Sequence, residues 1–290
     1  MSHETLIQTV CADFFNVDPT AVKLESRLMG GMSNFTYIIT VKDVRYTFRI
    51  PGKNAEKFVD RTVEKHHLEL IQPLNLDNDT IYLDLEKGYK IARYIEGVPM
   101  HEKNPHDYLE QAADILKTIH QSGLTSEYDY DPLGRLHVYE SHLKPYDHVH
   151  DARYDRLKAR WMALKADIDC HQKTLTHGDS QISNFVVTDE RLYLMDWEFS
   201  GNNDPFYDIA CFGNTNFDHA IALLPVYLEK TPDAEAFNRL YFWRTFQCLQ
   251  WHNVALYKAY IGLSADLKID FAKVANLYLD KAEALLDKLK

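Results

Sequence analysis

The feature that most constrains the fold is a change of hydrophobic periodicity near residue 96. Before it, short runs of β-branched and aromatic residues recur, at residues 22–29, 35–41, 45–50, 80–85 and 89–95. Beyond Gly97 and Pro99, apolar residues recur at helical spacing, over residues 108–122, 152–168, 234–260 and 271–289. A period of two is typical of strands and a period near 3.6 of helices. The sequence therefore predicts an α+β protein with a small β-rich lobe and a larger α-rich lobe.

Further patterns refine this prediction. A tight turn at Lys42-Asp43 joins the second and third strands, so we expect one antiparallel sheet of five strands. Helical patterns begin the chain at residues 6–14 and lie between the third and fourth strands at residues 55–71. A short hairpin, residues 184–187 with 192–195, interrupts the helical part. We predict two lobes, residues 1–96 and 97–290, joined at a hinge near residues 96–99.

Charge and composition exclude several classes of protein. The net charge is −11 and no Lys/Arg run is present, so we expect no nucleic-acid partner and a preference for a cationic one. No run of 18 apolar residues exists, and no basic, then apolar, stretch begins the chain, so we expect neither membrane insertion nor a signal peptide. The four cysteines form no CxxC pair, which is typical of reduced thiols. These features predict a cytoplasmic protein.

The segment that carries most chemistry contains Asp179, Asn184 and Asp196. Phosphoryl transfer needs a carboxylate to orient the attacking hydroxyl and oxygen ligands for the magnesium ions that bridge the phosphates. An Asp, an Asn five residues later and a further Asp after a strand form the catalytic arrangement of protein kinases. Asp and Asn also cap ordinary turns, which is the alternative for any one of them alone. All three in order favour the catalytic interpretation.

Three segments, residues 177–184, 193–200 and 203–210, make the chain resemble the choline/ethanolamine kinase branch of the aminoglycoside-phosphotransferase-like kinases. The resemblance covers nearly the whole length and implies a bilobal, protein-kinase-like fold with ATP and Mg²⁺ as cofactors. It implies that Asp179 is the catalytic base, with Gln181 beside the substrate hydroxyl. Magnesium would be held by Asn184 and Asp196, with Glu198 beside the second metal. Asp208 would brace the catalytic loop.

A second group of residues is expected to bind the nucleotide phosphates. The loop with Gly30, Gly31, Ser33 and Asn34 lies between the first two predicted strands, where glycines let backbone N–H groups approach phosphate oxygens. It is similar to the Gly-Gly-x-Thr/Ser-Asn loop of the family, although a plain turn is the alternative.

Arg49 ends the third strand, where protein kinases carry a phosphate-binding lysine, and its guanidinium offers a bidentate fork. A surface arginine is the alternative reading of this residue. We expect Arg49 to pair with a helix carboxylate, for which Glu64 is preferred over Glu56 and Glu69.

The hinge residues Tyr94, Ile95 and Glu96 are expected to contact the adenine edge through their main chain, as the hinge does in kinases of this type.

Residues for the acceptor substrate are predicted from aromatic side chains and one acid. A quaternary ammonium group is bound by aromatic faces near a carboxylate. The expected set is Trp251, Tyr207, Trp243 and Asp218. The family carries Trp-x-x-Trp on the matching helix, and here Trp251 is followed by Val254. Aromatic residues at helical spacing also form plain core, so that alternative stays open.

The sequence therefore predicts an ATP- and Mg²⁺-dependent kinase that phosphorylates the hydroxyl of choline or ethanolamine, a small cationic amino alcohol. One alternative within the fold is a different hydroxyl substrate, such as thiamine, a methylthio-sugar or an aminoglycoside. The non-enzymatic alternative is a pseudokinase-like module that binds a nucleotide.

Overall fold

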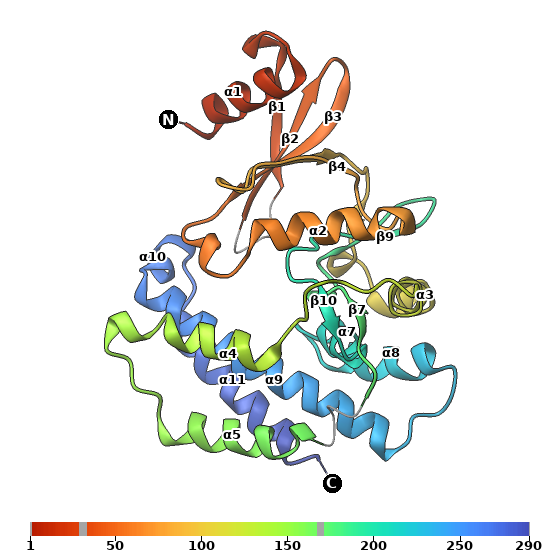
Figure 1. Cartoon of the computed structure of the whole chain (residues 1–290), viewed down its shortest axis with the longest axis vertical. Coiled ribbons are helices and arrows are strands. Elements are labelled where there is room, and N and C mark those ends of the chain that lie inside the picture. Colours follow the sequence, from red (N-terminus) through yellow and green to blue (C-terminus); the bar gives the residue numbers. More distant parts are fainter. Residues whose placement is uncertain (1, 29–33, 167–170, 290) are drawn as a thin grey trace. The chain divides into compact units, whose positions relative to one another are not determined.

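The chain forms two compact units in the computed structural model, which describes residues 2–28, 34–166 and 171–289 (Figure 1). Unit 1 consists of Met1–Lys103 and Ser183–Phe199, and unit 2 of Asn104–Ile182 and Ser200–Lys290. These units differ from the predicted division at residue 96, because the segment 183–199 belongs to unit 1. The physical reason is strand pairing, since β6 (Val98–Pro99) pairs with β8 (Phe185–Val187), which pairs in turn with β9 (Leu192–Leu194).

Unit 1 is built around the predicted antiparallel sheet of five strands, in the order β1-β2-β3-β5-β4. The strands are β1 (Lys23–Leu28), β2 (Asn34–Val41), β3 (Val44–Pro51), β4 (Thr80–Leu83) and β5 (Lys90–Arg93). The β2–β3 turn has positive φ at both Lys42 (50°) and Asp43 (61°). Such a two-residue turn matches the twist of an antiparallel pair, which explains the tight connection.

The two faces of this sheet have different roles. Helix α1 (His3–Phe15) packs on one face, where Ile7 and Cys11 join a core that includes Phe48 and Ile91. Neighbouring residues of a strand point to opposite faces. Arg49 and Lys90, which are register partners on β3 and β5, therefore point to the other face, toward helix α2 (Arg61–Ile71).

The expectation of one continuous helix over residues 55–71 is wrong in its first part. Ala55–Lys57 forms a 3₁₀ turn, and α2 begins at Arg61. Asp60 sets this start, because its side chain accepts hydrogen bonds from the backbone N–H groups of Thr62 (2.8 Å) and Val63 (3.4 Å). Arg61 and Glu64 consequently lie one turn apart on the same helix face.

Unit 2 is mainly helical, with two short strands that pair with each other, β7 (Thr174–Thr176) and β10 (Gly201–Asn203). Its described α-helices are α3 (Leu109–His120), α4 (Pro132–Ser141), α5 (Ala152–Ala163), α7 (Phe206–Phe212), α8 (Asp218–Leu228), α9 (Ala234–Tyr260), α10 (Leu263–Leu267) and α11 (Phe271–Leu286). The bounds of α9 are those predicted. The helical periodicity did not predict α4, α7, α8 and α10, which are short, and α8 contains Pro225.

Helix α9 forms the centre of unit 2, and α11 runs beside it (Figure 1). Seventeen of its residues are buried, on all sides of the helix. A helix that is buried all round belongs to a core. Buried polar side chains such as Arg244 and Gln247 recur along it. None of the helices in the described ranges, α9 included, has the length and hydropathy needed to cross a bilayer.

Candidate active site

The catalytic loop predicted around Asp179 follows strand β7 in unit 2. Gly178 adopts φ +79°, in the left-handed region that favours glycine. This conformation turns the chain so that the backbone N–H groups of both His177 and Gly178 point to the same side chain. His177 itself is fully buried, and its Nδ1 accepts the backbone N–H of Asp179 at 3.1 Å. The loop is therefore held by its own histidine.

Asp208 anchors this loop from helix α7. Its carboxylate accepts the backbone N–H groups of His177 (2.7 Å) and Gly178 (2.9 Å), and its Oδ2 lies 3.0 Å from Nε2 of His120 on α3. Burial alone would raise the pKa of Asp208, but the hydrogen bond from His120 and the nearby histidines hold it below its ordinary value. Asp208 thus braces the loop as expected. Sequence reasoning missed His120, which is 88 residues away along the chain.

Asp179 is almost buried, with 8% of its surface exposed. Its Oδ2 accepts a hydrogen bond from Nε2 of Gln181 at 3.0 Å, and its Oδ1 faces the Cys211 thiol at 3.7 Å. The structure thus brings Gln181 to the carboxylate that the sequence assigns as the base. The catalytic role of both residues stays a prediction.

The hairpin of unit 1 brings the other two residues of the kinase pattern together. Phe185 pairs with Leu194, and beyond them the backbone N–H of Met195 donates to the carbonyl of Asn184 at 2.8 Å. Asn184, just before β8, and Asp196, just after β9, therefore lie at the same end of the hairpin. Asp196 has φ +70°, an uncommon conformation for a residue with a side chain and one that occurs often at functional sites.

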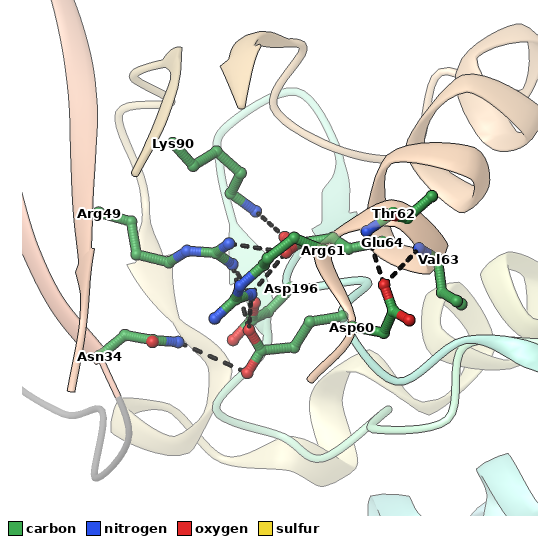
Figure 2. A network of polar contacts seen from close by, with 10 residues as sticks. Asn34, Arg49, Asp60, Arg61, Thr62, Val63, Glu64, Lys90 and Asp196 are labelled. Carbon is green, nitrogen blue, oxygen red and sulfur yellow. Dashed lines mark hydrogen bonds and ion pairs between the residues drawn. The ribbon is translucent and has the colours of Figure 1, made fainter. Parts of the chain in front are cut away.

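A buried network of charges lies beside this hairpin, within unit 1 (Figure 2). Nη2 of Arg49 lies 2.7 Å from Glu64, and Nη1 lies 3.2 Å from Glu198 and 3.4 Å from Asp196. Glu64 is therefore the helix partner of Arg49, as preferred. Glu198 also accepts a long hydrogen bond of 3.5 Å from Nδ2 of Asn34.

Two cations of this network were not found from the sequence. Nη1 of Arg61 bridges Glu64 (2.5 Å) and Glu198 (2.8 Å), and Nζ of Lys90 lies 3.3 Å from Glu64. The spacing of Arg61 three residues before Glu64 is a signal that could have identified the first. Lys90 can be placed only once the β3–β5 register is known.

The network shifts the protonation of its members in different directions. Burial would raise the pKa of Glu64, but Lys90, Arg49 and Arg61 hold it well below its ordinary value. Burial raises the pKa of Glu198, and the neighbouring Asp196 carboxylate adds to this effect against the two arginines. Glu64 is thus a fixed anion. A further cation beside Glu198 would stabilise the ionised form of that carboxylate.

The donor set of this region fits magnesium. Carboxylate oxygens of Glu64, Asp196 and Glu198 lie within 4.8 Å of one another, and Mg²⁺ prefers such hard ligands. Glu64 is committed to three cationic side chains. Asp196 is the more accessible acid, with 35% of its side chain exposed. Asp196 and Glu198, with Asn184 on the same hairpin, are therefore the residues that would hold the ion.

The predicted nucleotide-contacting segments are only partly described. Gly30, Gly31 and Ser33 lie outside the described residues. In the hinge, the backbone N–H of Tyr94 donates to the carbonyl of Arg45 at 3.2 Å, and Glu96 is exposed. Ile95 is half-buried. An adenine contact through this main chain stays a prediction.

Gly97 allows close packing of the hinge. A Cβ built there would lie 2.6 Å from the carbonyl of Val187 on β8, so this approach needs glycine.

The predicted substrate residues differ in their burial. Tyr207 and Trp243 are buried and pack against each other with ring centroids 5.6 Å apart, and the Tyr207 hydroxyl lies 2.5 Å from that of Tyr130. Both residues are part of the aromatic core of unit 2. Trp251 is half-buried and Asp218 is exposed at the start of α8. A substrate-binding role for these residues stays a prediction.

Comparison with known proteins identifies the family. The model of the phosphotransferase enzyme family (APH) matches residues 26–243, which include the catalytic loop, the β8–β9 hairpin and the charge network of unit 1. The chain belongs to the phosphotransferase enzyme family. This membership confirms the expectation of a phosphotransferase.

Within this family the chain is choline-kinase-like. It is 28% identical to protein LicA of Haemophilus influenzae over 188 residues, which are 63% of this chain. That match spans only 55% of the length of the relative. The crystal structure of choline kinase LicA from Streptococcus pneumoniae superposes with a TM-score of 0.81 at 25% identity, covering 99% of both chains. A LicA structure in complex with AMP gives a TM-score of 0.78 at 24% identity over the whole of both chains. The predicted kinase-like fold is confirmed.

Proposed function

We propose that this phosphotransferase uses ATP and Mg²⁺ to phosphorylate the hydroxyl of a small amino alcohol, choline first and ethanolamine second. The observation that carries the proposal is the braced catalytic loop. Asp179 is held by its backbone to His177 and by its side chain to Gln181, and the loop is anchored on buried Asp208. A carboxylate held in this way can accept the proton of an attacking hydroxyl without first reorganising.

The charge network of unit 1 supports the metal and nucleotide parts of the proposal. When bound, magnesium would supply positive charge to the transferring phosphoryl group, and Asp196, Glu198 and Asn184 would hold it. The ion pair with Glu64 fixes the orientation of the Arg49 guanidinium before a nucleotide binds. Its buried Nε has no hydrogen-bond partner among the described residues. That donor would suit a phosphate oxygen.

The choice of choline is supported by similarity. The S. pneumoniae relative is a choline kinase, and its fold matches this chain over 99% of the length. The net charge of −11 is compatible with a cationic substrate. Val254, where the family has a second tryptophan, is buried, so any aromatic cage here would lack that wall.

The test is release of ADP with a panel of acceptors at saturating ATP and Mg²⁺. The panel contains choline, ethanolamine, thiamine, a methylthio-sugar and an aminoglycoside, with a no-acceptor blank. We expect turnover with choline or ethanolamine above the other three. Turnover with only an uncharged sugar would replace the proposed substrate class. Nucleotide binding without turnover on any acceptor, with or without Mg²⁺, would favour the pseudokinase-like module instead.

A further inference from the structure

Arg244 of helix α9 is a buried cation that the proposed function does not use. Only 2% of its surface is exposed, and no carboxylate of the described residues lies within 4.0 Å of its nitrogens. Its guanidinium donates to three neutral acceptors, Oδ1 of Asn214 (3.1 Å), the backbone carbonyl of Asn214 (2.8 Å) and Oε1 of Gln247 (3.0 Å). Burying a charge without a counter-ion is costly, so such an arginine needs a reason to be there.

Asn214 connects this arginine to the catalytic loop. Its Nδ2 donates to Oε1 of Gln181 at 2.9 Å, and Nε2 of Gln181 donates to Oδ2 of Asp179 at 3.0 Å. Four side chains from α9, the α7–α8 connection and the catalytic loop thus form one chain of hydrogen bonds. All four belong to unit 2.

The ends of this chain fix its direction. A guanidinium can only donate, so Asn214 must turn its oxygen toward Arg244 and its nitrogen toward Gln181. Gln181 must then accept with its oxygen and donate with its nitrogen. An ionised carboxylate can only accept, which is what Asp179 does at the far end. Reversing either amide would set two donors or two acceptors against each other.

We propose that Arg244 is a positioning residue that acts through Asn214 to turn the N–H of Gln181, rather than its carbonyl, toward Asp179. A hydrogen bond from this N–H favours the ionised form of Asp179, which is the form a base requires. The inference rests on the proposed function in one respect, the assignment of Asp179 as the base.

Asn214→Asp tests the proposal most sharply. Asp can accept from Arg244 and gives it a counter-ion, but it cannot donate to Gln181. Gln181 would then turn its N–H toward residue 214 and its carbonyl toward Asp179. We expect an unchanged or raised melting temperature together with a kcat lowered about 10–100-fold, the factor for losing a hydrogen bond to a charged group. KM for ATP should stay as in the wild type.

Asn216→Asp is the matched control, because it adds the same charge two residues away on an exposed side chain. Oδ1 of Asn216 accepts the backbone N–H of Asp218 at 3.1 Å just before α8, and a carboxylate oxygen of Asp can accept it in the same way. We expect wild-type kcat. An equal loss of kcat in both variants would mean that charge alone is responsible and would overturn the proposal.

We call the path from Arg244 through Asn214 and Gln181 to Asp179 the relay. A double-mutant cycle with Gln181→Leu separates this relay from a direct effect of residue 214 on Asp179. If Asn214 acts through Gln181, Asn214→Asp should lower kcat less than twofold in the Gln181→Leu background. The same fold-loss in both backgrounds would overturn the relay. Arg244→Lys, which still only donates, should retain more kcat than Arg244→Gln, which can also accept.

Failure of the proposed function is distinguishable from failure of the relay. If the wild type turns over no acceptor, the base assignment fails. If the wild type is active and Asn214→Asp matches it in kcat, the relay alone is wrong.

Discussion

At the scale of single residues, the protein depends on carboxylates whose partners are already in place. The clearest case is Asp179. Asp179→Asn keeps the size of the side chain but removes its negative charge, so we expect turnover to fall by about 10²–10⁴, the usual contribution of a positioned base. Nucleotide affinity and melting temperature should change little. Steady-state ADP release measures turnover, nucleotide titration measures affinity, and thermal unfolding measures the melting temperature. Asp189→Asn, on an exposed turn, is the control. Near wild-type turnover in Asp179→Asn would rule out the base.

Asp208 makes a second prediction at this scale, on stability. Asp208→Asn cannot accept both backbone N–H groups of the loop and His120, so we expect a loss of about 3 kcal/mol in the free energy of unfolding. The folded pKa of Asp208 lies below its ordinary value of 3.8. Its contribution is therefore present above about pH 4 and is lost as the pH falls further.

Denaturant unfolding between pH 7 and pH 3 measures the difference in the free energy of unfolding between wild type and Asp208→Asn. This difference should become smaller as the pH falls. A difference that stays constant across this pH range would mean that Asp208→Asn destabilises the protein by something other than the loss of the negative charge.

At the scale of elements, the β8–β9 hairpin unites the proposed metal ligands. Asp196→Ala removes the more accessible carboxylate, and no neutral replacement binds Mg²⁺ as well. We expect an inactive enzyme or one that needs much more Mg²⁺ for half-maximal rate. Asp189→Ala, at the turn of the same hairpin, should leave the Mg²⁺ requirement unchanged. An unchanged requirement in Asp196→Ala would remove this residue from the metal site.

Helix α2 offers an element-scale prediction that separates buried from exposed charges. Arg61→Met leaves Glu64 and Glu198 with one cationic partner fewer in a buried setting, and we expect it to cost about 3–5 kcal/mol. Lys65→Met removes the exposed pair with Glu69, at 3.7 Å on the same helix, and should cost less than about 1 kcal/mol. Equal losses of unfolding free energy in the two variants would mean that the buried ion pairs of Arg61 contribute no more to stability than the exposed Lys65–Glu69 pair.

Elements were predictable from sequence where the pattern was long. The 27 residues of α9 carry enough apolar positions to fix both ends, and Asp233 and Ile261 flank them as caps. The three-residue strands β7 and β10 have no periodicity to detect, and their pairing depends on contacts between distant segments. The same distinction holds in the site. The kinase pattern and the Arg49–Glu64 pair follow from order along the chain, whereas Lys90 and Arg244 join the site only through the fold.

At the scale of the whole molecule, unit 1 is assembled from two separate segments. Residues 1–103 contain Arg49, Arg61 and Lys90 but only one of the three acids that neutralise them, Glu64. We expect a fragment of residues 1–103 to lack a cooperative thermal transition. Joining residues 183–199 to it by a flexible linker should restore the transition, as calorimetry can measure. A cooperative transition in residues 1–103 alone would show that the hairpin is dispensable.

The same arrangement has a consequence for synthesis on the ribosome. A nascent chain that has released residue 103 must wait for residue 199, which takes about 5–20 s at ~5–20 residues per second. During this interval the sheet carries a surplus of positive charge on one face. Early parts of unit 2 emerge before unit 1 can be completed. The order of translation thus leaves the first third of the chain with Arg49, Arg61 and Lys90 short of two of their acids until Asp196 and Glu198 have been synthesised.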